Sequence, residues 1–206
     1  MSSIRRHFIV GYGSLINSIS RSQTGETGQV WPVKLTGYER HWSVMSPEFG
    51  MSSVAVLKIE DSASSHVCNG VLVEVPEDQL TLFDEREKGY QRVRVAPDSI
   101  EAYSGALLPD GTYWIYITDR VDSPSQQCPI ALSYVDVILT GCFEFSDAFL
   151  EDLITYTKGW DSVVLNDRLS PRYPRVQTQL DTRILAPYLR LITPLTSEEL
   201  SVTYEL

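Results

Sequence analysis

One glutamate falls on the apolar face of a predicted helix, where a carboxylate could move protons. The helical pattern starts near Pro76, whose missing N–H suits a first turn, and ends at Gly89. At about 100° per residue, Leu80, Phe83 and Glu87 share one face of this helix. Burying an ionised carboxylate there costs free energy, which raises the pKa of the carboxyl and suits it to proton transfer.

Glu87 also has a purely structural interpretation. A glutamate at the end of a helix can bend out to water or pair with an arginine, and most carboxylates in proteins are solvated in this way. Asp78 and Glu85 point to the opposite side of the predicted helix. The helical pattern alone therefore leaves both interpretations of Glu87 open.

A second feature is a glycine-containing turn directly after a short apolar strand. Gly11-Tyr12-Gly13-Ser14-Leu15 follows Phe8-Ile9-Val10. The two glycines permit a tight turn and a close approach of the backbone to a ligand. Successive N–H groups in such a turn can bind an anion, for example a carboxylate. The turn lacks the lysine of a P-loop, and a dinucleotide fingerprint would need glycine in place of Ile16. An ordinary turn at a strand end is the alternative.

Composition narrows the class of protein. A chain of 206 residues favours one domain with one core. Its net charge is −10, because 27 acidic residues outweigh 17 basic ones. An acidic protein of this kind argues against a nucleic-acid partner, which needs a basic surface, and against an anionic membrane surface.

The cysteines and histidines predict neither a disulfide framework nor a metal site. The three cysteines, Cys68, Cys128 and Cys142, are widely spaced, and the histidines, His7, His41 and His66, are isolated. A Cys–His catalytic pair has no supporting motif. The apolar run at residues 8–10 is too short for a signal peptide, and no stretch reaches transmembrane length. We therefore expect a cytoplasmic protein without a metal or other cofactor.

The elements that must position these residues are mostly strands first and mostly helices later. We expect strands over residues 8–10, 30–35, 38–44, 53–59, 67–75 and 91–95, with a bulge or close backbone approach at Gly70. A hairpin around Pro109-Asp110-Gly111 would join residues 104–108 to residues 113–118. Residues 17–29 are predicted to be a loop and residues 61–65 a turn.

Helical patterns dominate beyond residue 120. We expect helices over residues 130–142, over residues 147–158 with Ser146 as the N-cap, and over residues 178–193 with an interruption at Pro187. Residues 160–175 are irregular. This order predicts an α+β fold with an antiparallel or mixed sheet, open or closed into a barrel, rather than a doubly wound parallel sheet.

The ordered set of motifs resembles the γ-glutamylcyclotransferase-like family. It consists of Tyr12-Gly13-Ser14-Leu15, then Gly70-Val71-Leu72-Val73-Glu74-Val75, then Glu87-Lys88-Gly89-Tyr90-Gln91-Arg92. The Gly37-Tyr38 turn before Trp42, and Ser133-Tyr134 ahead of Gly141, are similar to that family as well. The resemblance covers roughly residues 8–160.

The resemblance implies a small mixed β-barrel flanked by helices. Residues 1–160 would form the γ-glutamylcyclotransferase-like domain, and residues 161–206 would be a C-terminal extension packed on it. The extension, including Asn166-Asp167-Arg168 and Pro171-Arg172-Tyr173-Pro174, is not explained by the common core of the family.

The resemblance also implies a site. Tyr12, Gly13, Ser14 and Leu15 would hold a γ-glutamyl group, and Glu87 would be the acid and base. On spacing alone, Asp84 and Glu85 are rivals for that role. The pocket would be lined by Tyr90, Tyr116 and Tyr134.

The reaction implied is cyclisation of a γ-glutamyl amide to 5-oxoproline with release of the free amine. The substrate would be a small molecule: glutathione, a γ-glutamyl amino acid, a γ-glutamylamine or a γ-glutamyl group on a larger intermediate. A non-catalytic ligand-binding or interaction protein on the same fold is the alternative. The sequence does not predict the oligomeric state.

Overall fold

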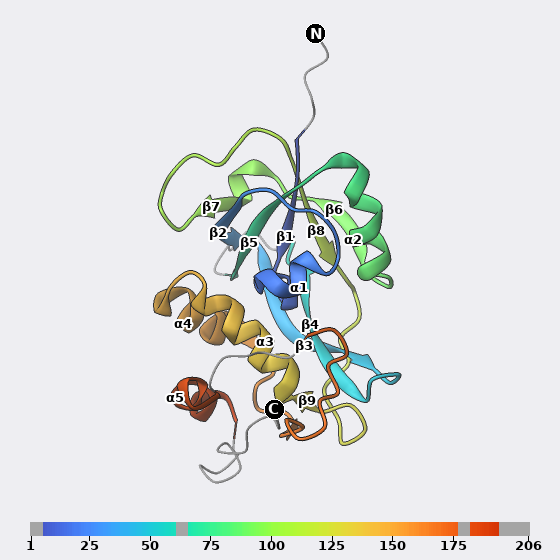
Figure 1. Ribbon diagram of the computed structural model, residues 1–206. Helices are drawn as coiled ribbons and strands as arrows, with labels where there is room; N and C mark the ends of the chain where they lie inside the picture. The colour runs from blue at the N-terminus through green and yellow to red at the C-terminus, as the bar shows by residue number, and fades with distance from the viewer. Residues whose placement is uncertain (1–5, 61–65, 177–181, 194–206) are drawn as a thin grey trace.

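The largest sheet has six strands and is mixed, as predicted. The computed structural model describes residues 6–60, 66–176 and 182–193 (Figure 1). Parallel pairing joins β1 and β8, and every other neighbouring pair in this sheet is antiparallel. In sheet order, the strands are β6 (Gln91–Arg94), β8 (Thr112–Ile117), β1 (His7–Gly11), β5 (Val67–Val75), β2 (Val30–Thr36) and β7 (Ile100–Ala102).

Two smaller sheets accompany the large one. The first contains β3 (Tyr38–Ser46), β4 (Met51–Lys58) and β10 (Thr157–Lys158), and the second pairs β9 (Ile130–Ala131) with β11 (Val164–Leu165). The strand order of the large sheet is linear from β6 to β7, and among the described residues no pairing closes it. The α+β class is therefore confirmed, whereas the closed barrel is not.

Burial explains why β1 and β5 are the central strands. All five residues of β1 are buried, and seven of the nine in β5 are buried. Strands covered on both faces have continuous apolar runs of this kind. Gly70 makes the close backbone approach predicted for it, since a Cβ atom there would lie 2.7 Å from the carbonyl oxygen of Gly11.

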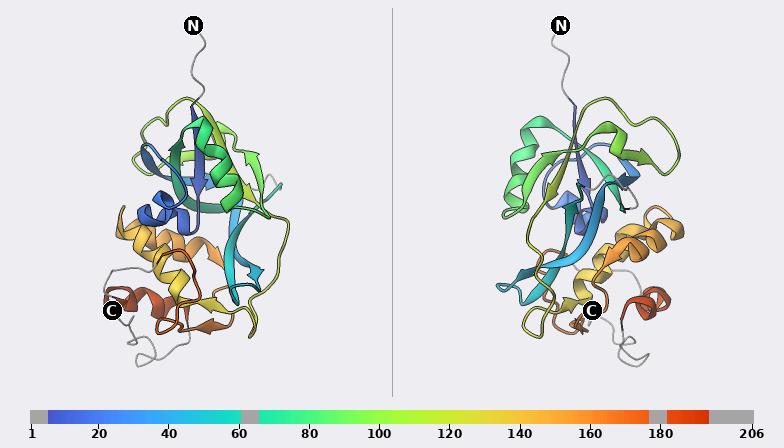
Figure 2. Two further views of the ribbon diagram at one scale, coloured as in Figure 1. Left: turned by 45° about the vertical axis from the view of Figure 1, so that its right-hand side comes forward. Right: turned by 180° about the vertical axis from the view of Figure 1, so that it is seen from behind.

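Helices cover the sheets (Figure 2). α3 (Leu132–Phe143) packs against α4 (Asp147–Tyr156), and α4 packs on β5. α2 (Leu80–Arg86) is preceded by the 3₁₀ turn η2 (Glu77–Gln79), and η3 (Pro97–Ser99) precedes β7. Ser146 is the N-cap of α4 as predicted, and its side chain accepts a hydrogen bond from the Phe149 N–H. α5 (Thr182–Ile192) corresponds to most of the predicted helix 178–193 and contains Pro187. Residues 178–181 of that prediction lie outside the described residues.

Two predictions about local structure are wrong. The predicted loop 17–29 contains a helix, α1 (Ser18–Ser22), because the Asn17 side chain caps it by accepting a hydrogen bond from the Ser20 N–H. The hairpin around residues 109–111 is absent: residues 104–108 form no strand, Leu107 is 98% exposed, and β8 pairs with β1 and β6 instead. Both edges of β8 are already paired, one with β1 and the other with β6, which leaves no edge for residues 104–108. The predicted turn 61–65 lies outside the described residues.

Buried polar contacts of Asp167 and Arg168 hold the segment of residues 164–173 against α3. The Asp167 carboxylate accepts hydrogen bonds from the Ser133 N–H at 2.8 Å, the Ser133 hydroxyl at 2.6 Å and the Arg172 N–H at 2.7 Å. Arg168 forms a bidentate ion pair with Asp136 at 2.7 and 2.8 Å, with both side chains fully buried. The division into residues 1–160 and an extension 161–206 stays a prediction.

Arg40 lies on β3 and connects the six-stranded sheet and the β3–β4–β10 sheet to α4. It is 1% exposed, and its five N–H groups reach oxygen acceptors. Nε donates to Thr157 Oγ1 at 2.7 Å, and Nη1 donates to the Tyr12 carbonyl at 3.1 Å. Asn69 accepts through its carbonyl and its side chain, each at 2.7 Å, and the Leu153 carbonyl accepts at 3.2 Å. Full use of the donors is what allows a guanidinium to be buried.

We expect the substitution Arg40→Met to lower the free energy of unfolding by about 3 kcal/mol or more, because several buried acceptors lose their donor at once. Urea unfolding followed by circular dichroism measures this change. The exposed Arg190 on α5 is the control, since Arg190→Met changes the charge equally. Equal unfolding midpoints for the two variants would contradict the role given to Arg40.

Candidate active site

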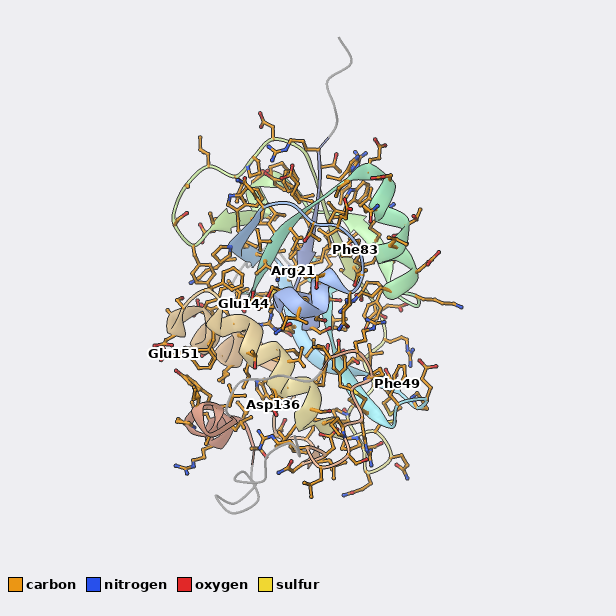
Figure 3. The ribbon with its side chains drawn as sticks, viewed as in Figure 1. Arg21, Phe49, Phe83, Asp136, Glu144 and Glu151 are labelled. Carbon is orange, nitrogen blue, oxygen red and sulfur yellow. The ribbon has the colours of Figure 1, made fainter. Side chains whose placement is uncertain are left out.

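A cavity of about 640 Å³ is lined by every predicted site residue. It lies among the loop after β1, the end of α2, the β3–β4 hairpin, β8, α3 and residues 173–175. In Figure 3, Phe83 marks α2 and Phe49 marks the hairpin that borders the cavity. The predicted residues in its wall are Tyr12, Gly13, Ser14, Leu15, Glu87, Tyr90, Tyr116 and Tyr134.

The loop after β1 presents its backbone to the cavity. The Gly13 carbonyl accepts from the Ile16 N–H at 2.9 Å, which closes the 3₁₀ turn η1 (Ser14–Ile16). In the described part of the chain, no protein acceptor meets the N–H groups of Gly13, Ser14 and Leu15. A Cβ atom on Gly13 would lie 2.9 Å from both the Tyr134 hydroxyl and a Val54 methyl group. Glycine therefore keeps this backbone close to the cavity wall.

Several contacts hold that loop in place. The Tyr12 hydroxyl donates to the Tyr116 carbonyl at 2.6 Å, while Arg40 binds the Tyr12 carbonyl. Arg21 on α1 and Glu144 after α3 form an ion pair at 3.8 Å, and Figure 3 shows where both lie. Gly141 on α3 packs directly on Asn17, with room for no side chain. The loop is thus fixed by β8, β3 and α3 together.

Glu87 caps α2 and is largely shielded from water. Its N–H donates to the Phe83 carbonyl at 2.9 Å, and its side chain is 20% exposed. Leu80 and Phe83 are buried on the same face, as predicted, although α2 ends at Arg86 rather than reaching Gly89. Burial raises the pKa of the Glu87 carboxyl, while the guanidinium groups of Arg86 and Arg175 oppose that rise.

The two rival acids are placed differently from Glu87. Asp84 accepts a hydrogen bond from the Tyr116 hydroxyl at 2.8 Å and pairs with Arg92 at 3.2 Å. Glu85 borders the cavity but is exposed to solvent. Of the three acids, Glu87 alone combines shielding from water with a place in the cavity wall.

Sequence reasoning missed Arg86, the side chain that ties Glu87 to the loop. It is 4% exposed, and its Nε lies 3.2 Å from Glu87 Oε1. Its Nη1 donates to the Ser20 carbonyl at 2.7 Å and to Thr24 Oγ1. Its Nη2 donates to Ser14 Oγ at 3.1 Å and to Ser20 Oγ at 2.9 Å. An arginine on a helix is usually solvated, so no local pattern indicates these contacts.

The three tyrosines form a wall with protonated hydroxyl groups. Tyr134 packs against Trp42 and Tyr173, with ring centroids 5.7 and 5.0 Å apart. The Tyr90 hydroxyl points to the Val54 carbonyl at 3.5 Å. Burial raises the pKa of Tyr90, Tyr116 and Tyr134 well above the ordinary value. These groups are therefore neutral donors at physiological pH.

Residues 173–175 also line the cavity, which the sequence did not predict. The Tyr173 N–H donates to Ser133 Oγ at 3.2 Å, and its hydroxyl lies 3.4 Å from Ser20 Oγ. Arg175 Nη2 lies 3.5 Å from the Arg86 carbonyl oxygen. Residues 173–175 thus form part of the cavity wall.

The described ranges 6–60, 66–176 and 182–193 contain no candidate metal site and no helix that could span a membrane. No group of His, Cys, Asp and Glu residues there has the arrangement needed to hold a metal ion. No helix there has the length and apolar composition to cross a membrane.

Solved structures with this fold include γ-glutamyl cyclotransferases. A structure named gamma-glutamyl cyclotransferase is 14% identical and covers 79% of this chain and 95% of its own, with a TM-score of 0.56. An uncharacterised human protein is 15% identical and covers 85% and 95%, also with a TM-score of 0.56. A yeast γ-glutamyl cyclotransferase specific to glutathione is 14% identical and covers 75% and 98%, with a TM-score of 0.51.

Comparison by sequence gives a different result. No family model and no curated protein matches the chain. Identities of 14–15% carry the fold alone and leave substrate and reaction open. The chain therefore shares the fold of the γ-glutamyl cyclotransferases.

Proposed function

We propose that this protein is an enzyme that cyclises a γ-glutamyl amide to 5-oxoproline and releases the free amine. The observation that carries the proposal is the position of Glu87. Its shielded carboxylate and residues 13–15, whose N–H groups have no acceptor among the described residues, line one cavity of about 640 Å³. That volume suits a small-molecule substrate.

In the proposed reaction, the α-amine of the γ-glutamyl group attacks its own γ-carbonyl carbon. The ionised Glu87 takes a proton from the α-ammonium, so that the nitrogen can form the new C–N bond. The γ-carbonyl oxygen becomes an oxyanion, and the C–N bond to the leaving amine then breaks. Glu87 gives this first proton to the leaving nitrogen before that bond breaks. It then takes the second proton from the attacking nitrogen and passes it to the released amine, which leaves as an ammonium ion. One carboxylate thus serves as base and as acid, and it ends ionised as it began.

The N–H groups of Gly13, Ser14 and Leu15 would bind the α-carboxylate or the developing oxyanion of the substrate. Holding the amine against the carbonyl contributes much of the rate acceleration, because good orientation lowers the barrier of an intramolecular reaction by about 7–11 kcal/mol. Proton transfer by Glu87 adds about 10²–10⁴-fold. Neither contribution needs a nucleophilic side chain.

The Arg86–Glu87 ion pair favours a second candidate, a binding protein without catalysis. At 3.2 Å, the guanidinium could make Glu87 a structural partner rather than a base. On this alternative, the cavity would bind a γ-glutamyl compound and leave it intact. Assay of 5-oxoproline over a panel of γ-glutamyl compounds separates the two candidates, because binding without release of 5-oxoproline supports the second.

We expect Glu87→Gln to lower kcat by about 10²–10⁴-fold, because the amide has no basic oxygen to accept the proton. The fold is expected to persist, since the two side chains have the same shape. Release of 5-oxoproline measures turnover, and circular dichroism checks folding. Glu85→Gln is the matched control, an exposed acid at the same cavity that is expected to keep turnover. Wild-type turnover by a folded Glu87→Gln variant would exclude the proposed role.

The pH dependence of kcat/KM should have an acid limb above the usual range of a glutamate. Glu87 must be ionised to act as the base, so kcat/KM falls as pH drops through its raised pKa. The groups that act on it electrostatically are Arg86 of α2, Arg175 of the C-terminal segment, and four tyrosine hydroxyls that stay neutral, those of Tyr12, Tyr90, Tyr116 and Tyr134. An acid limb at or below pH 4.5, the ordinary value for the group, would contradict this assignment.

We expect Gly13→Val to lower kcat/KM by about 10²-fold, the scale associated with displacing a reacting group by an ångström. The new Cβ atom would meet the Tyr134 hydroxyl and Val54 and push the loop into the cavity. Steady-state kinetics measure the loss, and thermal unfolding shows how much of it comes from instability. Unchanged KM and kcat in this variant would count against the loop as the substrate site.

A further inference from the structure

The rim of the cavity carries positive charge although the whole chain has a net charge of −10. Lys88, Arg120 and Arg175 are exposed cations in its wall. Two exposed acids, Glu48 and Glu85, border the same space. Deeper in the cavity, Arg86 and Glu87 balance one another. The cavity wall therefore holds four basic residues against three acidic ones.

Arg175 is a second arginine, after Arg86, whose charge acts on the Glu87 carboxylate. Its Nη2 lies 3.5 Å from the Arg86 carbonyl oxygen, one residue before Glu87. Its charge lowers the pKa of the Glu87 carboxyl and of the Arg86 guanidinium. Glu87 is already paired with Arg86 at 3.2 Å. A further anion between the two guanidinium groups and the rim would complete the charge balance.

Two of these three cations have no carboxylate partner among the described residues. In the described ranges, no carboxylate lies within ion-pair distance of Arg175 or Lys88. Arg120 pairs with Asp122 at 3.0 Å, and both side chains of that pair are well exposed. An exposed pair of this kind is weak and exchanges readily with a competing anion.

Buried contacts hold the backbone that carries Arg175. Two residues earlier, the Tyr173 N–H donates to Ser133 Oγ, and the Tyr173 ring packs on Tyr134. Asp167 receives two hydrogen bonds from Ser133. Between Tyr173 and Arg175, Pro174 restricts the backbone. Arg175, which lines the cavity, is therefore attached to a well-held stretch of backbone.

We propose that Arg175, assisted by Lys88 and Arg120, binds an anionic group, a carboxylate or a phosphate, on the amine side of the substrate. This inference rests on the proposed function, in which Glu87 and residues 13–15 hold the γ-glutamyl side. The leaving amine then extends from Glu87 toward the rim, where the cations are. A guanidinium matches either anion because it can donate two parallel hydrogen bonds. Arg175 is thus a specificity-determining residue.

The test compares leaving amines that differ in charge and little in size. γ-Glutamyl-glycine carries a carboxylate, γ-glutamyl-aminomethylphosphonate carries a phosphate-like anion, and γ-glutamyl-glycinamide is neutral. We expect the wild-type protein to prefer an anionic substrate over glycinamide by about tenfold or more in kcat/KM, the scale of a hydrogen bond to a charged group. The ratio between the two anionic substrates identifies which anion the rim accepts.

Arg175→Gln should remove most of that preference through KM. Loss of its charge also raises the pKa of Glu87 for all three substrates alike, so the readout is the ratio of kcat/KM between the anionic and neutral substrates. Arg175→Lys should retain part of the preference, because it keeps the charge. The matched control is Arg190→Gln, which removes an exposed arginine on α5 that does not line the cavity. Equal losses for the anionic and neutral substrates, or no change for either, would overturn the proposal.

Direct binding separates this inference from the proposed function. Calorimetry of the three compounds with Glu87→Gln, and with the double variant Glu87→Gln/Arg175→Gln, needs no turnover. Tighter binding of an anionic compound that disappears in the double variant supports the subsite even if no 5-oxoproline forms. Turnover of all three compounds with equal binding would retain the proposed function and reject the subsite.

Discussion

The buried guanidinium of Arg40 is the constraint on which the arrangement of sheets and loop depends. Arg40 is 1% exposed, so its charge is buried, and its guanidinium donates five hydrogen bonds to oxygen atoms. The acceptors belong to the loop after β1, to β5, to the end of α4 and to β10. Because the guanidinium is planar and rigid, these four segments have one relative arrangement in which every N–H group is satisfied. The Tyr12 carbonyl is one of the acceptors, so the same group that joins the sheets also positions the loop.

Arg86 likewise connects several segments at the cavity. Arg86 binds Ser14 and Ser20 through one nitrogen and Thr24 through another, and it stands 3.2 Å from Glu87. Arg86 therefore links the proposed base, through an ion pair, to the proposed substrate loop, through hydrogen bonds. The same contact that positions Glu87 also limits the rise of its pKa, because a nearby cation opposes the effect of burial.

Local patterns predicted much of the fold because their causes are local. The apolar run of β5, the Ser146 cap and the close approach at Gly70 all follow from one or a few neighbouring residues. The same reasoning failed for α1, where one side-chain cap from Asn17 outweighs a loop-like composition. It also failed for residues 104–108, because turn residues at 109–111 indicate a bend without deciding which strands pair.

The sequence by itself determined which acid and which loop to consider. Glu87 follows Leu80 and Phe83 at helical spacing, and Tyr12-Gly13-Ser14-Leu15 follows a strand, so both are marked by their immediate neighbours. Only the tertiary structure decided that Arg86 joins them and that Arg175, 89 residues further along the chain, completes the wall. Such contacts depend on the distance between atoms in space, and residues so far apart in the chain leave no periodic pattern from which that distance could be predicted.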